Sequence, residues 1–80
     1  MDKKEMVRAR IGEILGKTEE ETKLELTNES SFANLGVESF TLVNMVIDLQ
    51  ETFKVRLNQE DLVEAHKIGD LINLVVTRMK

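Results

Sequence analysis

The sequence predicts an all-α fold: a small four-helix bundle with three main helices, a short third helix, and a long loop between helices 1 and 2. The chain contains no proline and only four glycines, so the turn residues that punctuate strand-rich folds are scarce. Its Leu, Glu, Lys and Met residues favour helix, and apolar residues recur at helical spacing in several segments. Because 80 residues support one hydrophobic core, we expect a single domain over residues 1–80.

The first helix is predicted from the N-terminal segment, where apolar side chains recur on one helical face. These residues are Val7, Ile11, Ile14 and Leu15. Asp2 and Glu5 have the spacing of a capping box at the start of this helix. Gly16 is its natural stop, since glycine accepts the left-handed conformation that often follows a helix.

The next segment, residues 17–36, is polar and breaks the helical pattern. A few apolar side chains can attach it to the bundle, namely Leu24, Leu26, Phe32 and Leu35. Glu21 follows Thr18 at capping-box spacing, so we expect a short turn of helix after Thr18. The remainder is expected to be a long loop.

The second main helix is predicted over residues 39–53, which carry two apolar lines. The first line is typical of a core-facing stripe and consists of Leu42, Val46, Leu49 and Phe53, widened by Met45. The second line, formed by Phe40, Val43 and Ile47, falls on a neighbouring face. Two explanations fit this line: the helix is central and packed on two sides, or the line stays exposed as a docking surface.

Two further helices complete the predicted bundle. Residues 54–57 form a short alternating link, after which Asn58 can cap a brief helix over residues 59–65 with Glu60 and Asp61 in its first turn. Gly69 lies near the start of the last helix and lowers its helix propensity. The apolar face of that helix is formed by Ile68, Leu71, Ile72, Val75 and Met79.

The composition excludes several classes of function. The formal charge is -4, whereas a general nucleic-acid binder needs excess basic charge. There is no cysteine and one histidine; we expect His66 at an exposed junction, and neither a metal site nor Ser-His-Asp catalysis is supported. No apolar run is long enough to span a bilayer, and no signal-peptide core follows Met1. We therefore expect a non-enzymatic, cytoplasmic protein. We also expect it to be a monomer.

The negative charge is concentrated around the second main helix. Residues 35–53 contain Glu38, Asp48 and Glu51 but no lysine or arginine. This is either an ordinary solvated face or a docking helix for enzymes that present basic patches around an apolar groove. Ahead of the helix, Gly36 permits a tight turn. Glu38 and Ser39 stand where a carboxylate and a hydroxyl meet the positive end of the helix dipole, and a serine there is usually a cap.

The most specific pattern in the chain is residues 35–40 (LGVESF), followed by Val43, Val46, Leu49 and residues 51–55 (ETFKV). This pattern resembles the acyl carrier protein family. The family signature, Leu-Gly-x-Asp-Ser-Leu, opens the second helix of these proteins. Residues 11–16 (IGEILG) resemble the end of the family's first helix, and residues 31–36 (SFANLG) resemble the end of its long first loop. The similarity covers nearly the whole chain, with Glu38 in place of the usual aspartate and Phe40 in place of the usual leucine.

The resemblance implies that Ser39 is esterified by a phosphopantetheinyl transferase with 4'-phosphopantetheine from coenzyme A. The terminal thiol of this group then carries acyl groups as thioesters. Ser30 and Ser31 rank below Ser39 because no docking helix follows them. The implied partners are acyl-loading, ketosynthase or acyltransferase-type enzymes of fatty acid or polyketide biosynthesis. The residues expected to dock these partners are Glu38, Phe40, Val43, Ile47, Asp48 and Glu51.

Other assignments stay open at this point. Thr41, Asn44 and Gln50 stand where acid is frequent in carriers of bacterial fatty acid synthesis. This keeps a specialised carrier for a polyketide or other secondary pathway open beside a carrier of fatty acid synthesis. The short charged segment after Met1 favours a free-standing carrier. A peptidyl or aminoacyl carrier is a variant, although Gly36 followed by valine favours acyl cargo. An adaptor that binds partners through the same helix, with Ser39 as a simple cap, is the alternative from another class.

Overall fold

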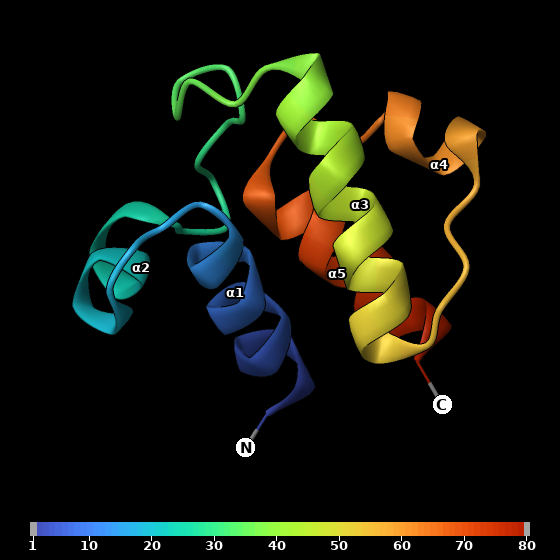
Figure 1. The fold of residues 1–80 in the computed structure, drawn as a ribbon, viewed down its shortest axis with the longest axis horizontal. Coiled ribbons are helices and arrows are strands. Elements are labelled where there is room, and N and C mark those ends of the chain that lie inside the picture. The colour runs from blue at the N-terminus through green and yellow to red at the C-terminus, as the bar shows by residue number, and fades with distance from the viewer. Residues whose placement is uncertain (1, 80) are drawn as a thin grey trace.

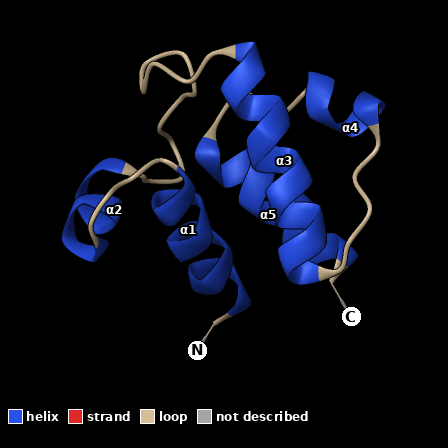
Figure 2. Cartoon of the chain, viewed as in Figure 1, coloured by secondary structure: helices blue, strands red, loops and turns tan. Residues whose placement is uncertain are grey.

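The computed structural model describes residues 2–79, which form five helices (Figures 1 and 2). They are α1 (Lys3–Ile14), α2 (Glu19–Glu25), α3 (Ser39–Phe53), α4 (Gln59–Val63) and α5 (Ile68–Arg78). Over these residues there is no β-strand, only an isolated bridge between Ser31 and Lys67. The predicted all-α bundle is confirmed. No helix in the described part of the chain combines the length and the apolar character needed to cross a bilayer.

The core lies between α1, α3 and α5, which pack against one another. The three helices contribute the buried side chains Val7 and Ile11, then Met45, Val46 and Leu49, then Ile68, Leu71, Ile72 and Val75. These are the residues whose helical spacing predicted the main helices. The connecting segments complete the core with Leu26, Phe32, Val55 and Leu57. Burial of these apolar side chains supplies the main driving force for the fold.

The ends of α1 differ in one detail from the prediction. The Asp2 carboxylate accepts a hydrogen bond from the Lys4 backbone N–H (3.1 Å), so the capping box expected with Glu5 is replaced by a simple N-cap. At the other end Gly16 adopts a φ of 73°, the left-handed conformation that terminates helices. Gly16 therefore ends the helix as the sequence predicts.

The turn of helix expected after Thr18 extends to the seven-residue helix α2. The predicted capping box forms: the Glu21 N–H donates to Thr18 Oγ1 (3.0 Å), and the Thr18 N–H donates to Glu21 Oε1 (2.9 Å). Thr22 is buried against α1, where a Cβ on Gly12 would overlap the Thr22 side chain. Tertiary contact with α1, which the local sequence does not encode, thus extends the turn into a helix.

The last two helices each show a local feature that their own sequence does not explain. α4 ends at Val63, two residues earlier than predicted: the Ala65 N–H donates to the Leu62 carbonyl three residues back (3.2 Å) in a tighter turn, and the Ala65 side chain is buried. The buried Gly69 N–H donates to the Asn28 carbonyl oxygen (3.0 Å), and a Cβ at position 69 would lie 2.7 Å from that oxygen. The glycine that weakens α5 as a helix is therefore required for the close approach of the long loop.

Candidate functional site

Ser39 is the first residue of α3 and is exposed. The preceding residue, Glu38, is the N-cap and has extended backbone angles, yet no side chain caps the helix in the described structure. Glu38 and Ser39 thus lie at the start of α3 as expected, but the side-chain cap that a serine at this position usually provides is not formed. Glutamate is a poor N-cap, and Ser39 already lies inside the helix. The first intrahelical bond runs from the Leu42 N–H to the Glu38 carbonyl (2.9 Å), so the three preceding amides have no intrahelical partner.

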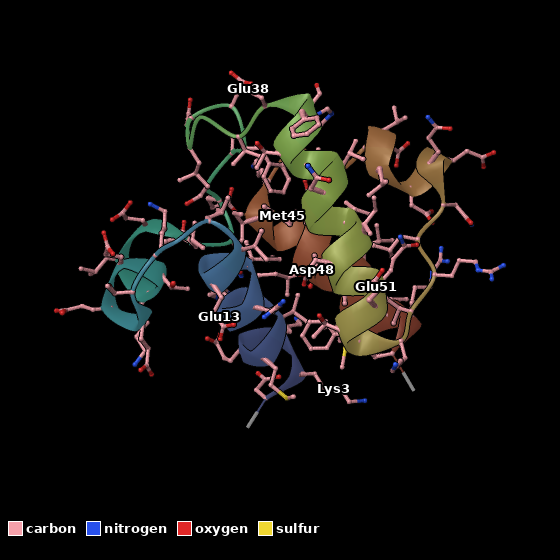
Figure 3. The ribbon with its side chains drawn as sticks, viewed as in Figure 1. Lys3, Glu13, Glu38, Met45, Asp48 and Glu51 are labelled. Atoms are coloured by element: carbon pink, nitrogen blue, oxygen red, sulfur yellow. The ribbon has the colours of Figure 1, made fainter. Side chains whose placement is uncertain are left out.

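The loop before α3 is held against the bundle by backbone hydrogen bonds. The Leu35 N–H donates to the Ser31 carbonyl (3.1 Å), and the Val37 N–H donates to the Phe32 carbonyl (2.9 Å). Gly36 lies between them with a φ of 72°, a conformation that favours glycine. Leu35 and Val37 are half-buried against the core. These contacts fix the position of the first turn of α3 at one end of the bundle. Figure 3 shows Glu38 at this end.

The two other serines of this region use their hydroxyls to hold the loop. Ser30 Oγ donates to the Glu25 carbonyl (2.8 Å) and accepts from the Thr27 N–H (3.0 Å). Ser31 Oγ accepts from the Asn34 N–H (3.1 Å). The helix α3 that follows Ser39 has no counterpart after either serine. Ser39 is consequently the exposed serine of this region whose hydroxyl carries no structural role.

The second apolar line of α3 is exposed. The exposed fractions are 76% for Phe40, 58% for Val43 and 47% for Ile47. The opposite face of the helix, which includes Met45 and Leu49, is buried. Of the two explanations that the sequence left open, packing on two sides is excluded. We call Phe40, Val43 and Ile47 the apolar face of α3.

The three acidic residues of α3 and its cap differ in their surroundings. Glu38 and Glu51 are exposed, whereas Asp48 is half-buried. Both carboxylate oxygens of Asp48 accept from the Arg10 guanidinium, at 2.8 Å from Nε and 2.7 Å from Nη2. Figure 3 shows Asp48 on the side of α3 that faces α1. The hydrogen bonds from Arg10 hold the pKa of Asp48 below its ordinary value.

Sequence reasoning missed Arg10. The partner of Asp48 is 38 positions away in the chain, and no local pattern pairs them. A second contact of Arg10, from Nη1 to Glu13 Oε2 (2.9 Å), lies within α1 at i, i+3 spacing. The sequence signal available was the contrast between a basic first helix and an acidic second one, which indicates attraction but no specific pair.

The remaining candidate, His66, lies exposed at the junction before α5, as predicted. Its carbonyl accepts from the Phe32 N–H (3.1 Å), so its backbone helps to hold the long loop. Within residues 2–79 no group of His, Cys, Asp and Glu side chains is arranged to hold a metal ion.

Comparison with known proteins gives a consistent result. Residues 5–75 match the family model described as "Phosphopantetheine attachment site". The acyl carrier protein homolog of Mycoplasmopsis pulmonis is 36% identical over 59 residues, which cover 74% of this chain and 81% of that protein. The acyl carrier protein of Syntrophus aciditrophicus is 36% identical over 70 residues, which cover 86% of this chain and 88% of that protein.

A solved structure has the same fold. The solution NMR structure of holo acyl carrier protein from Geobacter metallireducens aligns with a TM-score of 0.79 and covers 98% of this chain and 86% of that chain. The two sequences are 19% identical, so this likeness concerns the arrangement of the helices.

Proposed function

Since the chain belongs to the acyl carrier protein family, we propose that Ser39 is the residue that carries 4'-phosphopantetheine. The protein is an acyl carrier with a phosphopantetheine attachment site, and acyl carriers are not themselves catalysts. The assignment to Ser39 is supported by the position of this serine. Its hydroxyl is exposed at the first position of α3, beside helix amides that have no intrahelical partner.

The start of α3 fits the product of this modification. A transferase joins Ser39 Oγ to the phosphorus that bears the pantetheine arm, and the phosphoanhydride bond of coenzyme A breaks. Adenosine 3',5'-bisphosphate leaves, and the serine proton passes to a base of the transferase. The resulting phosphodiester is an anion. The positive end of the α3 dipole and the free amides of Ser39, Phe40 and Thr41 stabilise such a charge. When bound, the group supplies a thiol that carries acyl chains as thioesters.

The family implies interaction with a phosphopantetheinyl transferase and with synthase enzymes. We infer that acyl-loading, ketosynthase or acyltransferase-type enzymes dock on the apolar face of α3, because this face is exposed beside Ser39. Glu38 and Glu51 flank the face and support recognition of basic groups. A docking role for Asp48 stays a prediction from the sequence, as do a specialised polyketide pathway, a cytoplasmic location, a monomeric state and a single domain over residues 1–80.

The first experiment measures intact protein mass before and after incubation with coenzyme A, magnesium and a broad-specificity phosphopantetheinyl transferase. Starting from protein confirmed to be unmodified, the wild type is expected to gain one phosphopantetheine group, and Ser39→Ala is expected to gain none. Ser31→Ala is the matched control, because it removes a serine hydroxyl eight positions earlier and is expected to be modified like the wild type.

Two outcomes contradict the proposal. A mass gain on Ser39→Ala places the arm on another residue. The absence of a gain on the wild type favours the adaptor, which binds partners without modification. The thermal unfolding of Ser39→Ala should match that of the wild type, because the Ser39 side chain is not the N-cap and exposed substitutions are usually within about 0.5 kcal/mol.

A further inference from the structure

Arg10 on α1 forms a two-point ion pair with Asp48, the acidic side chain in the middle of α3. Its Nε and Nη2 donate to the two carboxylate oxygens of Asp48, in the parallel geometry that makes arginine–carboxylate pairs strong. Its third nitrogen, Nη1, donates to Glu13. Asp48 Oδ1 also accepts from Thr52 Oγ1 (3.0 Å). The charge of Asp48 is thus balanced by a neighbour on α1.

This ion pair borders the apolar face of α3. At 3.6 residues per turn, Asp48 lies about 100° around the helix from Ile47, toward α1. The side chains of Arg10 and Asp48 are 35% and 33% exposed, so an enzyme that covers the apolar face also meets the pair. The exposed acids Glu38 and Glu51 are separated by thirteen positions, or about 20 Å along the helix axis. Between Glu38 and Glu51, α3 therefore carries no acidic residue without a basic partner.

We propose that Arg10 determines which partner enzymes this carrier accepts, by neutralising Asp48 at the edge of the docking surface. The proposal rests on the function proposed above. The partner that fits is an enzyme with an apolar groove and basic groups only near the two ends of α3. A partner with a continuous basic row along the groove gains little attraction at Asp48, because it approaches the Arg10 guanidinium as well. Docking of this carrier is therefore expected to depend weakly on salt.

Arg10→Gln is the variant that exposes the charge of Asp48. It makes the net charge more negative by one unit, so it requires a control with the same change elsewhere. Lys23→Gln serves this purpose, because Lys23 is exposed on α2, and α2 and α3 lie on opposite sides of α1 (Figure 1). Asp48→Asn makes the opposite change at the docking surface, since it leaves the Arg10 guanidinium without this partner.

The measurement is kcat/KM for phosphopantetheine transfer to Ser39, as a function of sodium chloride concentration. The probe is a broad-specificity transferase whose carrier-binding surface is basic. At low salt we expect kcat/KM to rise about twofold to threefold for Arg10→Gln and to fall by about the same factor for Asp48→Asn, the effect of one charge roughly 6–10 Å away in water. The differences should vanish at high salt and appear in KM.

The double variant Arg10→Gln/Asp48→Asn should return to the salt dependence of the wild type. Structural damage would lower kcat/KM in both single variants, whereas the proposal requires changes of opposite sign. Circular dichroism confirms that each variant is folded, and Asp48→Asn tests the proposal alone if Arg10→Gln is not. Equal salt dependence of Arg10→Gln and Lys23→Gln, or no change for Asp48→Asn, overturns the proposal. Absence of transfer to every variant contradicts the carrier function itself.

Discussion

Asp48 is an acidic residue whose ionisation is coupled to the packing of α1 against α3. Hydrogen bonds from Arg10 are the main cause that lowers its pKa below the ordinary 3.8, and the bond from Thr52 adds to them. A carboxylate whose pKa is lowered by folding stabilises the folded state at every pH above its unfolded pKa. That stabilisation is lost as the pH falls below 3.8 and through the folded pKa.

The measurement at this scale is the free energy of urea unfolding, for the wild type and Asp48→Asn, from neutral pH down to about pH 3. We expect the wild type to be more stable by a constant amount at neutral pH and this advantage to shrink as Asp48 becomes protonated. In an Arg10→Gln background the same comparison should show a much smaller change with pH, because the cause of the shift is removed. A wild-type advantage that grows on acidification would refute the coupling.

At the scale of elements, the contact between α1 and α2 depends on a glycine. Gly12 is buried in α1, and a Cβ at this position would overlap the side chain of Thr22 on α2. The helix α2 in turn leads into the loop that reaches Ser39. Gly12 is therefore needed for close approach, since its φ is not in the left-handed region and alanine is the better helix former.

Gly12→Ala is accordingly expected to destabilise the protein by about 1–3 kcal/mol, the usual cost of overpacking a core, despite its gain in helix propensity. Urea unfolding measures this loss. The double variant Gly12→Ala/Thr22→Ala removes the side-chain atoms in the way and should recover part of the stability. If Gly12→Ala is as stable as the wild type, α2 does not pack on α1 as closely as the structure shows.

At the scale of the whole molecule, the sequence predicted the features that repeat and missed those that depend on distant contacts. The bounds of α3 and the core residues of the main helices follow from apolar periodicity, which a single segment contains. The length of α2 and the close approach of Gly69 to Asn28 depend on segments far apart in the chain. The same holds for the pairing of Arg10 with Asp48. The docking residues stay predictions, because exposure alone does not identify a partner.

Stability and docking should be separable in this molecule, because they use opposite faces of α3. Ile47 is 47% exposed and lies on the apolar face, whereas Leu24 is 74% exposed on α2. Replacing either with glutamine removes exposed apolar surface, so both variants should unfold within about 0.5 kcal/mol of the wild type.

The two variants should differ in docking. Ile47→Gln is expected to raise the KM of the transferase for the carrier about tenfold, as truncation of a central interface residue often costs more than 1 kcal/mol. Leu24→Gln should leave KM unchanged. Equal KM values for both variants, with Ser39 still modified, would mean that the partner reaches Ser39 without covering the apolar face. The exposure of Phe40, Val43 and Ile47 would then need a different explanation from transferase binding.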